Sequence, residues 1–257
     1  MVFRYDKTFE GLLTCVFDAY KLKSFPEHLL EEGEPLPLFN EGLWTVVSEA
    51  EKADRVWRGL QKKLSRDALH QLTRCWMADG TPHVDELLFR YICKNIDAPK
   101  SVEVNFADPD VLALSHVYKQ VGHESMRLIQ FARFQKAADG TYFAPFEPLH
   151  NVLPLAIGHF RNRFGDQKWI IYDVKRGYGF YFDLQRVQEI TFPQDAPFLH
   201  SGLLDSDKLD QDEALFQKMW QTYFKAISIK ERTNPRKHKQ DMPVRYWKFL
   251  TEKQGPK

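Results

Sequence analysis

The sequence predicts an α+β protein, and three observations support this prediction. In the N-terminal part, apolar residues recur at three- and four-residue spacing, which is typical of helices that bury one face. Between residues 121 and 184 the pattern changes to short alternating runs separated by turn residues, which is typical of β-hairpins. After these hairpins, an acidic segment leads to a basic tail, where we expect a C-terminal helix and a basic arm.

The chain begins with a predicted β-α-β unit. Val2–Tyr5 alternates like a short strand, and Thr8 suits the N-cap of a helix over Phe9–Lys21. We expect the Pro- and Glu-rich stretch Pro26–Phe39 to be a loop, and Trp44–Val47 to be a second strand that pairs with the first.

Helices account for most of the remaining N-terminal part, with breaks at Ser65 and at the turn that contains Gly80 and Pro82. The predicted helices cover Glu49–Lys63, Ser65–Ala78, Val84–Asn95 and Asp110–Glu124. The loop that ends near residue 105 is a suitable boundary between two domains. We therefore expect a mainly helical part, 1–105, and a hairpin part, 106–257, or else one compact unit.

The hairpin part is predicted as an antiparallel sheet of two β-hairpins that flank a helix. The first hairpin joins Met126–Phe134 to Thr141–Phe146 through the turn Ala138-Asp139-Gly140. A helix over Asn151–Phe164 follows. The second hairpin pairs Trp169–Val174 with Tyr178–Leu184 around Lys175-Arg176-Gly177.

Composition excludes several classes of protein. Cys15, Cys75 and Cys93 form no CxxC pair and have no nearby histidine cluster, which argues against a disulfide framework, a zinc site or an iron–sulfur cluster. We therefore expect no metal and no cofactor on this chain. No window approaches the roughly 18 apolar residues of a membrane span, and the N-terminus does not resemble a signal peptide. The expected compartment is the cytoplasm.

Charge is balanced over the whole chain but not along it. The net charge is +1, whereas residues 230–257 contain nine Lys/Arg and three Asp/Glu. Such a basic tail has two interpretations, a solvated helix end or a surface that attracts a polyanion.

The sequence lacks the familiar catalytic motifs GxGxxG after a strand, GxxxxGK[ST], HExxH and GxSxG. The weak catalytic candidates are His123 and Glu124, with Arg127 close behind, and Asp173 at the end of a predicted strand. The alternatives are that His123 is a satisfied polar residue and that Asp173 holds Arg163 or Arg176 in a salt bridge.

Several runs of residues together resemble one uncharacterised bacterial family, labelled as a DNA metabolism protein. They are Val121–Glu124, Ile129–Phe134, Val152–Leu155, His159-Phe160, Arg163-Phe164, Trp169–Asp173, Lys175–Gly177, Arg232–Lys237 and Met242–Lys248. The resemblance covers nearly the whole chain. It implies a context of DNA repair or modification, with a radical SAM protein as partner and, in some members, fusion to a uracil-DNA glycosylase-like domain.

This chain departs from the family pattern at two places. Members more often carry a His-Arg pair and a Gly-Phe pair where this sequence has Met126-Arg127 and Gln130-Phe131. The first departure removes a histidine, which weakens a general-base role for this region.

Cationic and aromatic residues give independent support to a nucleic-acid partner, because Lys and Arg contact phosphates and aromatic rings stack on unpaired bases. The nucleic-acid-binding candidates are Arg133, Arg161, Arg163, Lys175, Arg176, Arg232, Arg236, Lys237, Arg245, Trp247 and Lys248. The candidate stacking residues are Tyr142, Phe143, Trp169, Tyr178, Phe180 and Tyr181. The competing interpretations are core packing for the aromatics and, for Trp247, anchoring of the C-terminus on the sheet.

The preferred function is therefore a DNA-binding or complex-forming partner of a radical SAM enzyme in DNA repair or modification. One alternative is an enzyme that acts on damaged DNA through Glu124 and Asp173, which would require both carboxylates in one cleft. The other is a structural partner that makes no contact with nucleic acid.

Overall fold

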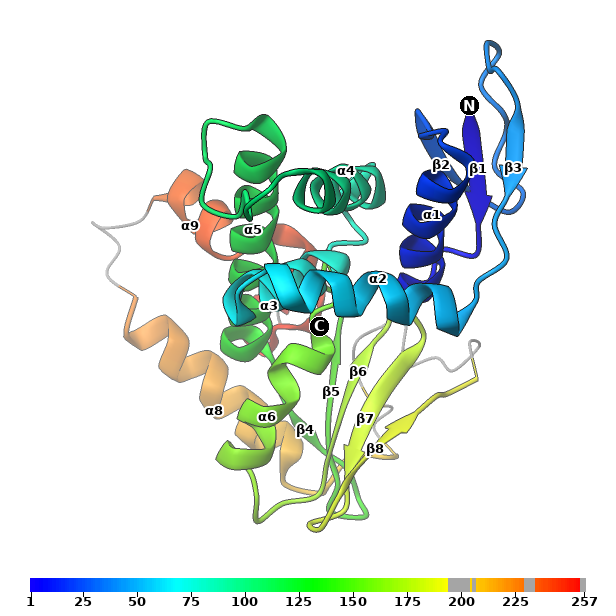
Figure 1. Ribbon diagram of the computed structural model, residues 1–257. Helices are drawn as coiled ribbons and strands as arrows, with labels where there is room; N and C mark the ends of the chain where they lie inside the picture. The colour runs from blue at the N-terminus through cyan, green and yellow to red at the C-terminus, as the bar shows by residue number, and fades with distance from the viewer. Residues whose placement is uncertain (194–203, 205–206, 229–233, 255–257) are drawn as a thin grey trace. The chain divides into compact units, whose positions relative to one another are not determined.

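The computed structural model describes residues 1–193, 204, 207–228 and 234–254, and the chain folds as two units, 1–122 and 123–257. The sequence places the boundary earlier, near residue 105. Each unit contains its own sheet, and both are mixtures of helices and strands (Figure 1). The predicted α+β class is confirmed.

The first unit contains a three-stranded parallel sheet in the order β2-β1-β3. Its elements are β1 (Val2–Tyr5), α1 (Phe9–Leu22), β2 (His28–Glu31), β3 (Leu43–Thr45), α2 (Ala50–Lys63), α3 (Arg66–Trp76) and α4 (Val84–Asp97). Thr8 caps α1 by accepting a hydrogen bond from the backbone N–H of Gly11 at 2.9 Å, as its sequence position predicts. Ser65 caps α3 in the same way.

The predicted β-α-β unit is present, with one strand that the sequence did not predict. β3 pairs with β1 as expected, but β2 lies within the stretch predicted as a loop. Only Leu29 of β2 is buried, so this short strand between Pro26 and Gly33 shows no recognisable alternation.

The helix α5 (Pro109–Phe131) is longer than predicted, and the strand predicted from Met126 is wrong over residues 126–131. Over residues 121–131 the buried positions are Val121, Glu124, Ser125 and Leu128, which recur with the period of a helix. Burial of this face favours continuation of the helix over the alternating strand. Residues 123–131 of α5 belong to the second unit.

The second unit is built on a five-stranded sheet in the order β4-β5-β6-β7-β8. Its elements are β4 (Gln135–Lys136), β5 (Tyr142–Phe146), α6 (Leu153–Arg163), β6 (Trp169–Asp173), β7 (Tyr178–Phe182), β8 (Val187–Ile190), α8 (Glu213–Ala226), α9 (Pro235–Asp241) and the 3-10 helices η2 (Val244–Phe249) and η3 (Thr251–Lys253). The hairpin β6-β7, its turn and the preceding helix agree with the sequence prediction.

This sheet is mixed rather than entirely antiparallel, because β5 and β6 run parallel. After β5, the chain crosses back through α6 to the end of the sheet at which β5 started. β6 therefore runs in the same direction as β5. The first hairpin keeps its predicted turn but has only two residues in β4, and β8 is an additional strand.

Apolar side chains cover both faces of the sheet. Trp169 and Phe160 contact each other between β6 and α6, with ring centroids 6.2 Å apart. On the opposite face, Phe143 and Tyr172 pack with Phe192. Of the six aromatic residues predicted as stacking candidates, two are therefore buried by packing in this sheet, Phe143 and Trp169, and the other four are partly exposed.

The predicted basic arm contains a short helix, α9. Pro235 occupies the first position of α9, where its missing N–H costs no hydrogen bond, and Asn234 caps the helix through the N–H of Lys237. η2 then places Tyr246 and Phe249 in the core of the unit.

Candidate nucleic-acid interface

A buried carboxylate, Glu124, lies at the centre of the second unit's polar contacts. Its Oε1 accepts hydrogen bonds from the Tyr246 hydroxyl and from the N–H of Leu149, the latter at 2.6 Å. Its Oε2 lies 2.6 Å from Nη2 of Arg245 and 3.5 Å from Nη1 of Arg127. This group, which we call the Glu124 network, ties together α5, η2 and the loop between β5 and α6.

Glu124 is ionised in this network. Burial by itself raises the pKa of the carboxyl, but hydrogen bonds from Tyr246 and Leu149 and the positive charge of Arg245 lower it below the ordinary value overall. Burial, together with the neighbouring carboxylate, raises the pKa of the Tyr246 phenol, which therefore stays neutral. With both oxygens engaged twice, Glu124 is an anchor for other residues and a poor general base.

Asp173 also helps to hold the loop between β5 and α6, through Arg176. It accepts the backbone N–H of Arg176 at 3.1 Å and Nη1 of its side chain at 2.6 Å. Arg176 and Lys175 in turn donate to the carbonyl of Leu149 at 3.0 and 3.3 Å. Burial raises the pKa of Asp173 overall, although Arg176 opposes that shift. The two candidate carboxylates are thus linked through Leu149, but both are buried and engaged, so they form no open acid–base pair.

The Glu124 network fixes the orientation of η2. Arg245 lies over the Tyr246 ring at 4.5 Å, and that ring stacks on Phe146 with centroids 4.5 Å apart and an interplanar angle of 21°. Lys248 forms an ion pair with Glu147. Because Tyr246 is held on the inside of η2, its neighbour Trp247 lies on a partly exposed side.

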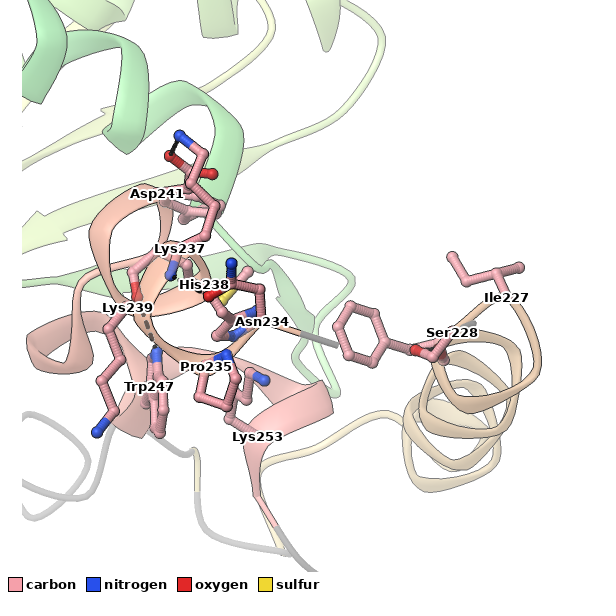
Figure 2. A pocket seen from close by; sticks show the side chains of 13 residues that line it. Ile227, Ser228, Asn234, Pro235, Lys237, His238, Lys239, Asp241, Trp247 and Lys253 are labelled. Atoms are coloured by element: carbon pink, nitrogen blue, oxygen red, sulfur yellow. Dashed lines mark hydrogen bonds and ion pairs between the residues drawn. The ribbon is translucent and has the colours of Figure 1, made fainter. Parts of the chain in front are cut away.

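Trp247 lines a cavity of about 760 Å³ between α9 and the end of α8, which we call the Trp247 pocket (Figure 2). Its aromatic lining comes from Trp247, Phe224 and Phe131. Its cationic lining comes from Lys237, Lys239 and Lys253. This volume falls within the range of ordinary small-ligand sites.

One ammonium group connects two of the rings. Nζ of Lys253 lies 5.0 Å from the centroid of Trp247 and 5.4 Å from that of Phe224, so it attracts both ring faces. The indole N–H of Trp247 donates to the carbonyl of Met242 at 3.0 Å, which fixes the ring plane.

His238 adds a buried polar atom to this pocket. Its ring lies 5.7 Å from that of Trp247, and its Nε2 is buried without a hydrogen-bond partner among the described residues. Desolvation and the nearby charge of Lys253 lower its pKa, so the imidazole is neutral at neutral pH. Lys237 pairs with Asp241 at 2.9 Å, whereas exposed Lys239 has no ion pair within the described part of the chain.

The other sequence candidates lie elsewhere or are already paired. Arg133 forms an ion pair with Glu252 at 2.7 Å, and its guanidinium lies 5.4 Å from the ring centroid of Trp220.

Arg161 and Arg163 are exposed at the end of α6, and the described residues provide no ion pair for either one. Eleven residues of helix separate this end from the loop at Leu149 by roughly 15 Å. His123 and Arg236 are exposed, and Arg232 lies outside the described residues.

The structure thus brings Lys175, Arg176, Arg245 and Lys248 together around the Glu124 network and places Trp247 and Lys237 in the adjacent pocket. Arg127 joins the two groups, because its guanidinium contacts both Glu124 and the carbonyl of Gln240 at the end of α9. Sequence reasoning missed the roles of Phe131, Phe224, His238 and Lys253, since no motif or spacing relates these four segments.

Metal sites and membrane spans are both missing from the part of the chain that the structure describes. None of its residues form a group of three or more His, Cys, Asp or Glu side chains able to hold a metal ion. None of the helices built from them is long and apolar enough to cross a membrane.

Comparison with known proteins places the chain in an uncharacterised family. A solved structure of a pGpG-specific phosphodiesterase, PggH from Vibrio cholerae, aligns with 88% of this chain and 99% of that one, at 11% identity and a TM-score of 0.33. That score is too low to support an argument about fold or function. No curated protein matches the sequence. The model of the domain of unknown function DUF4130 matches residues 82–252, so the chain belongs to the DUF4130 family.

Proposed function

We propose that this protein binds DNA as an accessory component of a repair or modification system, and that the Trp247 pocket receives part of the strand. The observation that supports this proposal is the combination of three lysines with aromatic rings around one open cavity. Lysines supply phosphate contacts, and aromatic rings stack on bases without regard to sequence.

The surroundings of the pocket add positive charge. Arg127, Lys175, Arg176, Arg245 and Lys248 belong to the contacts around Glu124 and Leu149, whereas the acidic partners there are Glu124, Asp173 and Glu147. Five cationic and three acidic side chains give this set a net charge of +2 (5 − 3).

A stacking pocket favours single-stranded or locally unpaired DNA over an intact duplex, because paired bases do not expose their faces. The proposed partner, from the family resemblance, is a radical SAM protein, with a uracil-DNA glycosylase-like protein in some relatives. The enzyme alternative receives less support, because Glu124 and Asp173 are both buried and are held by arginine side chains and backbone N–H groups.

Removal of the three pocket lysines tests the proposal. We expect K237A/K239A/K253A to weaken binding of a single-stranded oligonucleotide by at least about tenfold at moderate salt, because three phosphate contacts are lost. Fluorescence anisotropy with labelled single- and double-stranded oligonucleotides measures this effect on the full chain.

The matched control is R161A/R163A/K168A, which removes three cations from the far end of α6 and from the loop beyond it. We expect this variant to bind like the parent. If the control loses affinity and the pocket variant does not, the DNA-binding surface is at the end of α6. If the parent protein binds neither oligonucleotide, alone or with a radical SAM protein, that result favours the structural-partner alternative.

A further inference from the structure

A second cavity of about 600 Å³ lies in the second unit, formed by α8, the strands β4 and β5 and the 3-10 helix η3. We call it the Trp220 pocket. It shares no lining residue with the Trp247 pocket. Four aromatic rings line it, those of Phe134, Tyr142, Phe216 and Trp220. A cavity of this size with a mainly aromatic lining is typical of a site for a small molecule.

The Trp220 ring is held in place by its neighbours. Its indole N–H donates to Oε2 of Glu252 at 2.8 Å, and the side chain of Glu252 is fully buried. The guanidinium of Arg133 lies 5.4 Å from the ring centroid. Trp220 is nevertheless 39% exposed, and Phe216, one helical turn earlier, is 59% exposed. A ring that is fixed before a ligand arrives loses little conformational freedom on binding.

The charges around the pocket favour a neutral ligand. Arg133 and Lys136 both line it, so a cationic ligand would be repelled. Each of these cations already has an acidic partner, Glu252 at 2.7 Å and Asp210 at 2.9 Å, so little positive charge is left to attract a phosphate. A guanidinium plane also stacks well on a neutral aromatic ring.

Gln217 provides a hydrogen-bonding edge in this pocket. Its Nε2 donates to Oε1 of buried Glu213 at 3.0 Å, while Oε2 of Glu213 accepts the N–H of Lys136. Because a carboxylate only accepts hydrogen bonds, this contact fixes which way the amide faces. Its carbonyl oxygen and second N–H have no partner among the residues that the structure describes. An acceptor and a donor side by side match the edge of a nucleobase.

We infer that the Trp220 pocket binds an unpaired nucleobase, which stacks on the aromatic rings and forms hydrogen bonds with the amide of Gln217. The Thr251 hydroxyl lies at the same pocket and provides a further polar contact. Two sources offer this chemistry, a free nucleoside and a base of a single strand. The inference does not rest on the proposed binding of DNA at the Trp247 pocket.

Nucleoside binding by the full chain tests the inference. The probe is 2-aminopurine deoxyriboside, whose fluorescence falls when its base stacks on other rings. We expect a Kd of roughly 0.1–1 mM, an ordinary value for a ligand of this size. F216A should weaken binding by at least about tenfold, because one stacking surface is lost, whereas F216W should retain it. Q217L should weaken binding by roughly threefold to tenfold, because it removes the hydrogen bonds and keeps the side-chain volume.

The matched control is L215A. Leu215 is the neighbour of Phe216 on α8, is 57% exposed and lines neither pocket. This variant should bind the probe like the parent, and so should K237A/K239A/K253A. The inference is overturned if the parent does not quench the probe, if F216A binds it as well as the parent, or if only the lysine variant loses it. Displacement of the probe by choline rather than by thymidine would also overturn it, because the rings would then form a cage for a cation.

A second arm distinguishes the two sources of the base. The affinity of F216A for a single-stranded oligonucleotide is compared with its affinity for the probe. Loss of both identifies a base of the strand as the occupant. Loss of probe binding alone identifies a free nucleoside.

Discussion

Replacement of Glu124 by glutamine is expected to destabilise the second unit by about 2–4 kcal/mol. Removal of one member of a buried, hydrogen-bonded ion pair typically costs about 3–5 kcal/mol, and the partial exposure of Arg245 and Arg127 reduces this cost. Urea unfolding of the full chain measures the loss. Hydrogen exchange at the amide of Leu149, which donates to Glu124, should accelerate at the same time.

The effect of E124Q depends on pH in a defined direction. The pKa of Glu124 is lowered in the folded protein, so its contribution is fully present above the unfolded pKa near 4.5 and disappears as the pH falls through the folded value. The stability difference between the parent and E124Q should therefore be constant near neutral pH and shrink in acid. A difference that grows in acid would contradict the ionised state of Glu124.

Two other carboxylates serve as controls. D173N should cost less than E124Q, because burial raises the pKa of Asp173 and the asparagine oxygen can still accept from Arg176. E147Q affects only a half-exposed ion pair with Lys248 and should change stability by about 0.5 kcal/mol or less. Equal losses of unfolding free energy in all three variants would mean that Glu124 contributes no more to stability than the other two carboxylates.

The second large effect is expected at Gly179 in β7. A Cβ at this position would lie 2.5 Å from the carbonyl oxygen of Ile171 and 2.6 Å from Cδ2 of Tyr172 on the neighbouring strand. The strands must separate to accommodate a methyl group, so G179A should cost about 3 kcal/mol. The same shift would displace the turn that carries Lys175 and Arg176 and thereby the loop at Leu149.

Gly158 offers a matched glycine in the same unit. It is exposed within α6, and an added Cβ would meet no atom within 4 Å. G158A should therefore stabilise the protein by roughly 0.5–1 kcal/mol, since alanine is the better helix former. Thermal unfolding of both variants gives the comparison. If G179A is as stable as G158A, β6 and β7 do not approach each other as the structure shows.

The sequence predicted those elements correctly whose local residue pattern fits a single type of secondary structure. The hairpin β6-β7 follows from two runs of bulky residues around a turn in which Gly177 adopts a positive φ of 71°. The caps at Thr8 and Ser65 are equally local. The stretch from Met126 to Phe131 has a pattern that fits both a strand and a helix, and burial of Leu128 on the face of α5 decides for the helix.

The candidate site was only partly predictable, because its contacts join residues that are distant in the chain. Glu124 and Tyr246 are 122 residues apart, and nothing in either segment shows that they meet. Positive charge could be read from the sequence, but its neutralisation could not: Arg133 is paired with Glu252 and Arg176 with Asp173. Availability of a cation depends on its three-dimensional neighbours.

The salt dependence of single-strand binding tests the central claim most directly. Each lysine that contacts a phosphate of single-stranded DNA contributes about 0.7 to the slope of log K against log salt concentration. K237A/K239A/K253A should therefore reduce the slope by roughly 2, whereas R161A/R163A/K168A should leave it unchanged. An unchanged slope in the first variant would contradict the claim that the Trp247 pocket binds the strand.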